Sequence, residues 1–138
     1  MDKSNPSVNE AYKDALKALK NAHSPYSGLQ VACAIQRQGA GSADIGVNVE
    51  NASYGGTICA ERSAVVSMVS QYGVSPIEFV VVVSSLSGDP IPPCGLCLQV
   101  LSEFLDSDCP IFLGNAQGLQ EAVPAVTPRA CVPVPNRD

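Results

Sequence analysis

Three cysteines and one glutamate are the residues whose types and spacing could do chemistry. Cys59 and Glu61 lie two positions apart in the run CAER, and Cys94 and Cys97 lie three apart in the run PCGLC. The Cys-x-x-Cys spacing lets two sulfurs reach one small ion from a single turn, and Cys59 can add a third sulfur from another helix. Zinc prefers four tetrahedral ligands, and catalytic zinc sites leave one position to water. The sequence therefore predicts Zn²⁺ bound by Cys59, Cys94 and Cys97, with an open fourth position.

Glu61 and Arg62 follow Cys59 on the first turn of the same predicted helix. We expect the Glu61 carboxylate to lie beside the water and not on the metal, where one carboxylate can act first as base and then as acid. Three thiolates weaken the Lewis acidity of the ion, so a positive partner is expected. The predicted helix N-termini and the Arg62 guanidinium can both stabilise the sulfurs.

These motifs resemble a known family in their order and spacing. NVENASY at residues 48–54 precedes CAER, PCGLCLQ at 93–99 follows it, and SPYS occupies residues 24–27. From about residue 24 to residue 104 the chain is similar to the small, homotetrameric cytidine deaminases. A Cys-x-x-Cys pair alone is a weak signal, whereas this combination in this order is specific.

The resemblance implies zinc-dependent hydrolysis of cytidine and 2′-deoxycytidine to uridine and 2′-deoxyuridine, with release of ammonia in pyrimidine salvage. It implies that Asn48 and Glu50 hold the sugar, that Ala52 belongs to the substrate site, and that Tyr54 approaches the substrate of a neighbouring subunit. Strand alternation would aim Asn48 and Glu50 to the same side, and their donor and acceptors suit a hydroxyl group. The expected partners are a small nucleoside and further copies of the chain, in a homotetramer with shared active sites.

The chain departs from the family pattern at three positions. Leu29 stands where the family often has an aromatic residue, and Cys131 falls about where a second aromatic is common. Leu98 replaces the usual arginine after the last ligand. The first two changes leave open which cytosine compound is preferred, and the third leaves more of the charge neutralisation to Arg62.

Periodicity and turn signals predict the elements that must position these residues. A first helix is expected over 7–22, capped by a Ser7–Glu10 capping box. A glycine-rich turn between two β-like runs indicates a hairpin, and Gly73 is a plausible stop for the helix that begins near Cys59. The remaining predictions are strands over 29–37, 43–49, 77–84 and 110–113, helices over 59–72 and 95–105, and a short helix or final strand within 118–125.

The run Phe79–Val83 predicts the fold class. A continuous β-branched strand is typical of a sheet covered on both faces, which needs helices above and below it. With the family resemblance, we expect an α/β fold: a three-layer α/β/α sandwich around a mixed five-stranded sheet. The 138 residues suit one domain spanning 1–138.

Composition excludes several kinds of partner. The formal net charge is −5 with only 8 Lys and Arg residues, which argues against nucleic acid as a substrate. No apolar run is long enough for a membrane span, and the polar N-terminus lacks a signal-peptide core. We therefore expect no membrane partner and a cytoplasmic location, where the 6 cysteines stay reduced.

Three alternatives remain open. The nearest is a deaminase of a modified cytosine nucleoside, such as a nucleoside antibiotic, which Leu29 and Cys131 allow. A second is a structural zinc protein whose site is closed by Cys33, Cys109 or Cys131. A third is an inactive binding protein. Glu61 argues against the last two, because neither a closed site nor an inactive one has a use for it.

Overall fold

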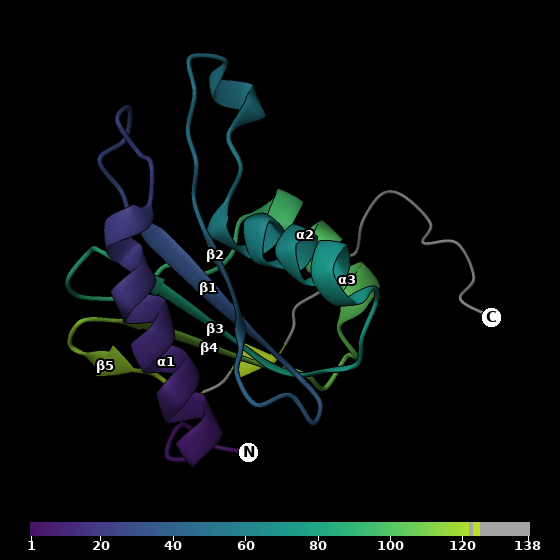
Figure 1. The fold of residues 1–138 in the computed structure, drawn as a ribbon. Helices are drawn as coiled ribbons and strands as arrows, with labels where there is room; N and C mark the ends of the chain where they lie inside the picture. Colours follow the sequence, from purple (N-terminus) through teal and green to yellow (C-terminus); the bar gives the residue numbers. More distant parts are fainter. Residues whose placement is uncertain (122, 125–138) are drawn as a thin grey trace.

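The computed structural model of the protein describes residues 1–121, 123 and 124. In these residues, helices and strands alternate along most of the chain (Figure 1). In chain order they are α1 (Pro6–Ala18), η1 (Leu19–Asn21), β1 (Val31–Arg37), β2 (Asp44–Val47), η2 (Tyr54–Gly56), α2 (Ala60–Tyr72), β3 (Ile77–Ser84), α3 (Gly95–Phe104), β4 (Pro110–Asn115), β5 (Gly118–Leu119) and β6 (Val123–Pro124).

One mixed sheet organises the fold. Its strand order is β2-β1-β3-β4-β5, and β6 pairs with β4 beside that path. β1 is antiparallel to both β2 and β3, β3 is parallel to β4, and β5 and β6 are antiparallel to β4. The predicted α/β fold with a mixed five-stranded sheet is confirmed, with β6 as a two-residue addition.

The two faces of β3 point to two separate cores. Phe79, Val81 and Val83 pack with α1, whereas Val80 and Val82 pack with residues of α2 and α3. Figure 1 shows the resulting layers, with α1 on one side of the sheet and α2 and α3 together on the other. The uninterrupted apolar run of β3 therefore follows from burial on both faces.

The first helix begins earlier than the sequence pattern predicts. The predicted capping box at Ser7 is wrong: Asn5 is the N-cap, and its side chain accepts a hydrogen bond from the backbone N of Ser7. Pro6 takes the first helical position, where its missing N–H costs nothing and its ring favours helical geometry. At the other end, α1 stops at Ala18 and the 3₁₀ turn η1 continues to Asn21.

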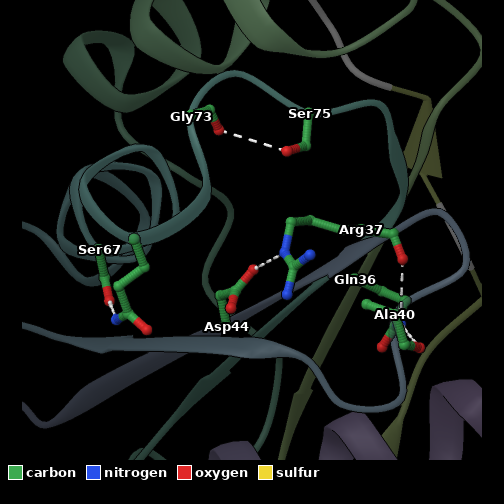
Figure 2. A network of polar contacts seen from close by, with 8 residues as sticks. Gln36, Arg37, Ala40, Asp44, Ser67, Gly73 and Ser75 are labelled. Carbon is green, nitrogen blue, oxygen red and sulfur yellow. Dashed lines mark hydrogen bonds and ion pairs between the residues drawn. The ribbon is translucent and has the colours of Figure 1, made fainter.

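A polar network closes the β1–β2 turn (Figure 2). A contact between Arg37 and Tyr72 ties this network to the end of α2. The Nε atom of Arg37 lies 2.7 Å from Oδ2 of Asp44, and Nε2 of Gln36 donates to the carbonyl of Ala40 at 2.8 Å. The guanidinium of Arg37 also lies 3.6 Å from the ring centre of Tyr72, the last residue of α2. A helix of this length spans roughly 20 Å, so this network holds the end of α2 that lies far from Cys59.

The N-terminal half of α2 lies directly against β2. A Cβ atom added to Gly46 would sit 2.2 Å from the backbone N of Ala64 and 2.6 Å from the carbonyl O of Ala60. Only glycine allows this approach, which fixes the first turn of α2 against the sheet. The helix ends at Gly73, whose positive φ of 74° is a backbone conformation that favours glycine.

Among the described residues, no helix is long and apolar enough to cross a membrane. The prediction of one domain over residues 1–138 stays a prediction, because the C-terminal segment lies outside the described residues.

Candidate active site

The three predicted zinc ligands meet at the N-termini of two neighbouring helices. Cys59 is the N-cap of α2, and Cys94 is the N-cap of α3. Cys97 lies in the first turn of α3 and is fully buried. The three sulfurs lie within 4.8 Å of one another, and those of Cys59 and Cys94 are 3.8 Å apart.

This spacing fits a zinc ion. Tetrahedral ligation with Zn–S bonds of about 2.3 Å separates any two sulfurs by roughly 3.8 Å. In the described part of the chain, this group contains three possible ligands and no fourth. Cys109 is not part of it, since its sulfur faces the carbonyl groups of Ile77 and Glu78 at the start of β3. The donor set therefore fits an open zinc site, while Cys131 lies outside the described residues.

The helix N-termini make the sulfur of Cys94 more acidic. Burial alone would raise the pKa of this thiol, but the backbone N–H groups of Cys97 and Leu96 and the thiols of Cys97 and Cys59 outweigh it. The net result is a pKa below the ordinary value. Neither helix has a side-chain cap, so the free N–H groups are available to a thiolate.

Cys97 lies in the opposite environment. Burial and the nearby Glu61 carboxylate raise its pKa well above the ordinary value, although a hydrogen bond from Arg62 partly opposes them. A thiol must lose its proton to bind zinc. The charge of the bound dication must therefore offset the cost of burying this thiolate.

Arg62 contacts the site as expected from its position after Glu61. One of its Nη2–H groups donates to the sulfur of Cys59 at 3.2 Å, and the same nitrogen lies 3.1 Å from the carbonyl O of Thr57. The hydrogen bond to Cys59 raises the pKa of the guanidinium, and the one to Cys97 adds a smaller increase. Together they outweigh burial, which lowers this pKa. Arg62 can thus bring a permanent positive charge to a sulfur-rich site, and this role stays a prediction.

A cavity of about 230 Å³ opens beside the thiols. Glu61, a residue that is only 5% exposed, lines this cavity from the first turn of α2. Its lining combines aliphatic side chains with two polar groups of residues, which we call the two polar sides of the cavity: Cys59, Glu61 and Cys94, and Asn48 and Glu50. Its lining is Ser27, Leu29, Val31, Asn48, Glu50, Tyr54, Thr57, Cys59, Ala60, Glu61, Val82, Ile91, Pro92 and Cys94. A larger hollow of about 370 Å³ lies between α1 and the β1–β2 turn, but none of the residues just named lines it.

Asn48 lies just after β2 and points into the cavity with a fixed amide orientation. Its Oδ1 accepts from the backbone N of Val31 at 2.9 Å, and its Nδ2 donates to the carbonyl of Leu29 at 2.8 Å. Because an amide nitrogen carries two hydrogens, one N–H of Asn48 remains for a ligand.

Glu50 lies two residues further along the chain and faces the same cavity. Its Oε1 accepts from the backbone N of Tyr26 and of Ser27, both at 3.0 Å, and its Oε2 accepts from the Ser27 hydroxyl at 2.5 Å. The pKa of this carboxyl is lowered, mainly by the hydrogen bond from the Ser27 hydroxyl. Burial opposes this shift, whereas the two backbone N–H groups and the nearby His23 add to it. Glu50 is therefore a carboxylate that can only accept hydrogen bonds.

The segment that carries Asn48 and Glu50 is joined to its neighbours on both sides. Glu50 N donates to the carbonyl of His23 at 2.8 Å, and Val49 exchanges backbone hydrogen bonds with Ile58 at 2.9 and 3.0 Å. Figure 1 shows this connection between β2 and α2 rising beyond one end of the sheet, beside the loop that precedes β1. The segment thereby joins the two polar sides of the cavity.

The two other predicted substrate residues lie differently. Tyr54 lines the cavity, yet 57% of it is exposed, and its ring meets that of Tyr26 edge-on at 6.2 Å. Ala52 is exposed on the loop and does not line the cavity. The structure thus brings Asn48, Glu50 and Glu61 together but leaves Ala52 outside.

Sequence reasoning assigned no role in the site to Ser27 or Thr57. Ser27 belongs to the SPYS run, which residue types mark as a turn before a strand and which the family resemblance places at the border of the pocket. Thr57 lines the cavity, and its buried Oγ1 has no hydrogen-bond partner among the described residues. No spacing rule connects Ser27 to Glu50, because their contact depends on how two distant segments pack.

The chain is similar to known proteins over most of its length. Residues 6–113 match the family model described as the cytidine and deoxycytidylate deaminase zinc-binding region. A cytidine deaminase of Halalkalibacterium halodurans is 42% identical over 106 residues, covering 77% of this chain and 78% of that protein. A cytidine deaminase of Sporosarcina psychrophila is 37% identical over 111 residues, covering 80% and 79%.

A solved structure agrees with these relatives. The crystal structure of cytidine deaminase from Burkholderia pseudomallei superposes with a TM-score of 0.77 at 34% identity, covering 85% of this chain and 91% of that one. Because the family model spans most of the chain and the sulfur cluster fits its zinc-binding region, the chain belongs to the cytidine and deoxycytidylate deaminase family, with zinc as its metal.

Proposed function

We propose that the protein is a zinc-dependent hydrolase that deaminates cytidine and 2′-deoxycytidine to uridine and 2′-deoxyuridine, releasing ammonia. One observation carries the proposal: a buried carboxylate, Glu61, shares one cavity with a three-thiol metal site and with two polar side chains suited to a sugar. A structural zinc site would need neither the carboxylate nor the cavity.

The proposed roles follow from the geometry. Cys59, Cys94 and Cys97 hold the zinc ion, which when bound supplies an activated water for attack at C4 of the base. Glu61 takes up a proton that the water releases and delivers it to N3 of the base. It then takes the proton of the hydroxyl group now bound to C4 and passes it to the amine, so that the C4–N bond breaks and ammonia leaves. The aliphatic side chains of Leu29, Val31 and Val82 at the cavity exclude bulk water and contact the base.

Asn48 and Glu50 are proposed to recognise one hydroxyl of the sugar. Asn48 offers its remaining N–H, and Glu50 offers lone pairs of its carboxylate. A hydroxyl is both donor and acceptor, so it satisfies the two groups together. Neither group distinguishes ribose from deoxyribose, and both substrates are therefore retained in the proposal.

A second candidate function keeps the same chemistry with a modified cytosine nucleoside as substrate. The observation that favours it is Leu29 in the cavity wall, where the family often has an aromatic ring. An aliphatic wall gives up the stacking that a ring offers to a base, worth roughly 1–3 kcal/mol in nucleic-acid binders, and it constrains the ring of the base less.

Oligomeric state and location belong to the proposal as well. A homotetramer with active sites shared between subunits, pyrimidine salvage in the cytoplasm, and the absence of nucleic-acid and membrane partners all remain predictions. The exposed Tyr54 ring at the cavity is consistent with a site that a neighbouring copy completes.

The deciding experiment is an ammonia-release screen on purified protein of measured zinc content. The panel contains cytidine, 2′-deoxycytidine, cytosine, cytidine phosphates and cytosine-nucleoside antibiotics. We expect about one zinc per chain and the highest kcat/KM for the two plain nucleosides. Turnover of an antibiotic with no turnover of cytidine would replace the proposal by the second candidate, and no turnover of any compound would reject both.

A further inference from the structure

We propose that Ser27 is a positioning residue for sugar recognition: its hydroxyl orients the Glu50 carboxylate toward the nucleoside without being one of the groups that react. The inference rests on the proposed function, because it concerns the same cavity. It goes beyond that function by assigning a role to a serine on the loop before β1, 23 residues away from Glu50 in the chain.

The direction of each hydrogen bond at Ser27 is determined by its neighbours. The backbone N of Leu29 donates to Oγ of Ser27 at 3.0 Å, so this oxygen acts as an acceptor there. The hydroxyl proton is then free to point at Oε2 of Glu50, 2.5 Å away. Since a carboxylate has no proton to give, this direction cannot be reversed.

The loop holds the two carboxylate oxygens in different ways. Oε1 accepts hydrogen bonds from two backbone N–H groups, those of Tyr26 and Ser27. Oε2 receives only the Ser27 hydroxyl among the contacts in the described residues. Ser27 therefore fixes the rotation of the carboxylate group, while Oε2 keeps lone pairs for a hydroxyl of the substrate.

The same loop also orients Asn48, through the carbonyl of Leu29 and the backbone N of Val31. Donor and acceptor for the sugar are consequently aligned by one segment, residues 26–31. Without the Ser27 hydroxyl, Glu50 would stay attached through Oε1 but lose the bond that orients Oε2. Sugar binding should weaken, whereas the chemistry at the base should not change.

The test compares wild-type protein with Ser27→Ala and Ser27→Thr, all loaded with zinc. Hydrogen bonds to charged groups are strong enough that Ser27→Ala should raise KM for cytidine roughly tenfold with kcat nearly unchanged. Ser27→Thr keeps a hydroxyl and should restore most of the loss. 2′,3′-Dideoxycytidine lacks both secondary hydroxyls of the sugar. For this nucleoside, the KM values of the Ser27→Ala and wild-type proteins should differ much less.

Ser85→Ala provides the matched control. The Ser85 hydroxyl also holds this segment, since it accepts from the backbone N of Gln30 at 3.1 Å, but it does not line the cavity. If Ser85→Ala loosens this segment, it should therefore change KM for cytidine and for the dideoxy analogue by similar factors. Thermal melts of all variants report whether any of them has simply lost its fold.

Each outcome decides the inference. A KM effect of Ser27→Ala that is specific to the hydroxylated nucleoside and is rescued by threonine supports it. The inference would be overturned if Ser27→Ala raised KM equally for both nucleosides, lowered kcat alone, or changed neither constant. Each of these results would leave the deaminase proposal intact. A wild-type protein that turns over no cytosine nucleoside would reject the proposed function and this inference with it.

Discussion

The two polar sides of the cavity are held in place in different ways. On the metal side, each of Cys59, Glu61, Cys94 and Cys97 caps a helix or belongs to its first turn. On the sugar side, Asn48 and Glu50 follow a short strand and are oriented by atoms of residues 26–31, which lie 17 to 24 positions away in the chain.

The difference shows what each side depends on. Helical geometry places ligands from their spacing alone, so the metal side needs only that α2 and α3 start where they do and lie side by side. The sugar side needs the correct approach of a loop to a strand, because every orienting bond crosses between segments. We therefore expect changes on the metal side to abolish chemistry and changes on the sugar side to alter affinity.

The largest effect is expected for Glu61→Gln. The amide cannot carry protons between water and the base, and positioned acid–base groups contribute about 10²–10⁴ in rate. We expect kcat to fall by that factor while the zinc content stays near one per chain. Steady-state ammonia release together with metal analysis checks both parts. Normal turnover by this variant would remove Glu61 from the mechanism.

Gly46→Ala should damage the metal side through the fold. The added methyl group would meet the backbone of Ala60 and Ala64, which cannot move aside without shifting the first turn of α2. Overpacking of this kind costs about 1–3 kcal/mol and occasionally more, and zinc retention should fall with it. Urea unfolding and metal analysis measure the two effects.

Gly41→Ala is the control for that variant, because a Cβ at Gly41 meets nothing within 4 Å. It should leave stability and zinc content nearly unchanged. If Gly46→Ala behaved like Gly41→Ala, the contact between β2 and α2 would not hold the metal side in place.

Arg62→Ala should weaken zinc binding without unfolding the protein. Removing a partner of a metal ligand typically costs 10–100-fold in metal affinity or activity, and Arg62 donates to the Cys59 sulfur. Competition with a chelator measures the affinity. Arg37→Ala serves as the comparison, since Arg37 lies at the other end of α2, over Tyr72. It should lower stability but leave the zinc affinity unchanged.

The smallest effect concerns pH and the sugar side. The pKa of Glu50 is lowered in the folded protein by Ser27 and the neighbouring N–H groups, so its ionisation stabilises the fold above the unfolded pKa of about 4.3. This contribution is lost as the pH falls through the lower, folded pKa. Urea unfolding of wild type and Glu50→Gln should therefore show a stability difference at pH 7 that narrows below about pH 4.

Loss of zinc in acid affects both proteins in that experiment, so the difference between them isolates Glu50. A gap that stays constant from pH 7 to the acid limit would show that the carboxylate gains nothing from residues 26–31.

Much of the fold was predictable because its signals are local. The apolar run of β3 indicated burial on both faces, and its predicted limits, residues 77–84, agree with Ile77–Ser84. Gly73 was recognised as the end of α2 from residue type alone. The start of α1 was not, because a capping box at Ser7 competes with Asn5-Pro6, and only the backbone geometry decides between them.

The candidate site likewise has a part that local sequence signals predicted and a part that only the tertiary structure revealed. Residue types and spacing predicted the cluster of three thiols on the metal side and the carboxylate beside it, because one helical turn places side chains three residues apart on the same face. Only the tertiary structure brought Ser27 to Glu50, aligned the Asn48 amide and left Ala52 outside the cavity. The physical reason is that hydrogen bonds between distant segments depend on how strands and loops pack, which no local spacing specifies.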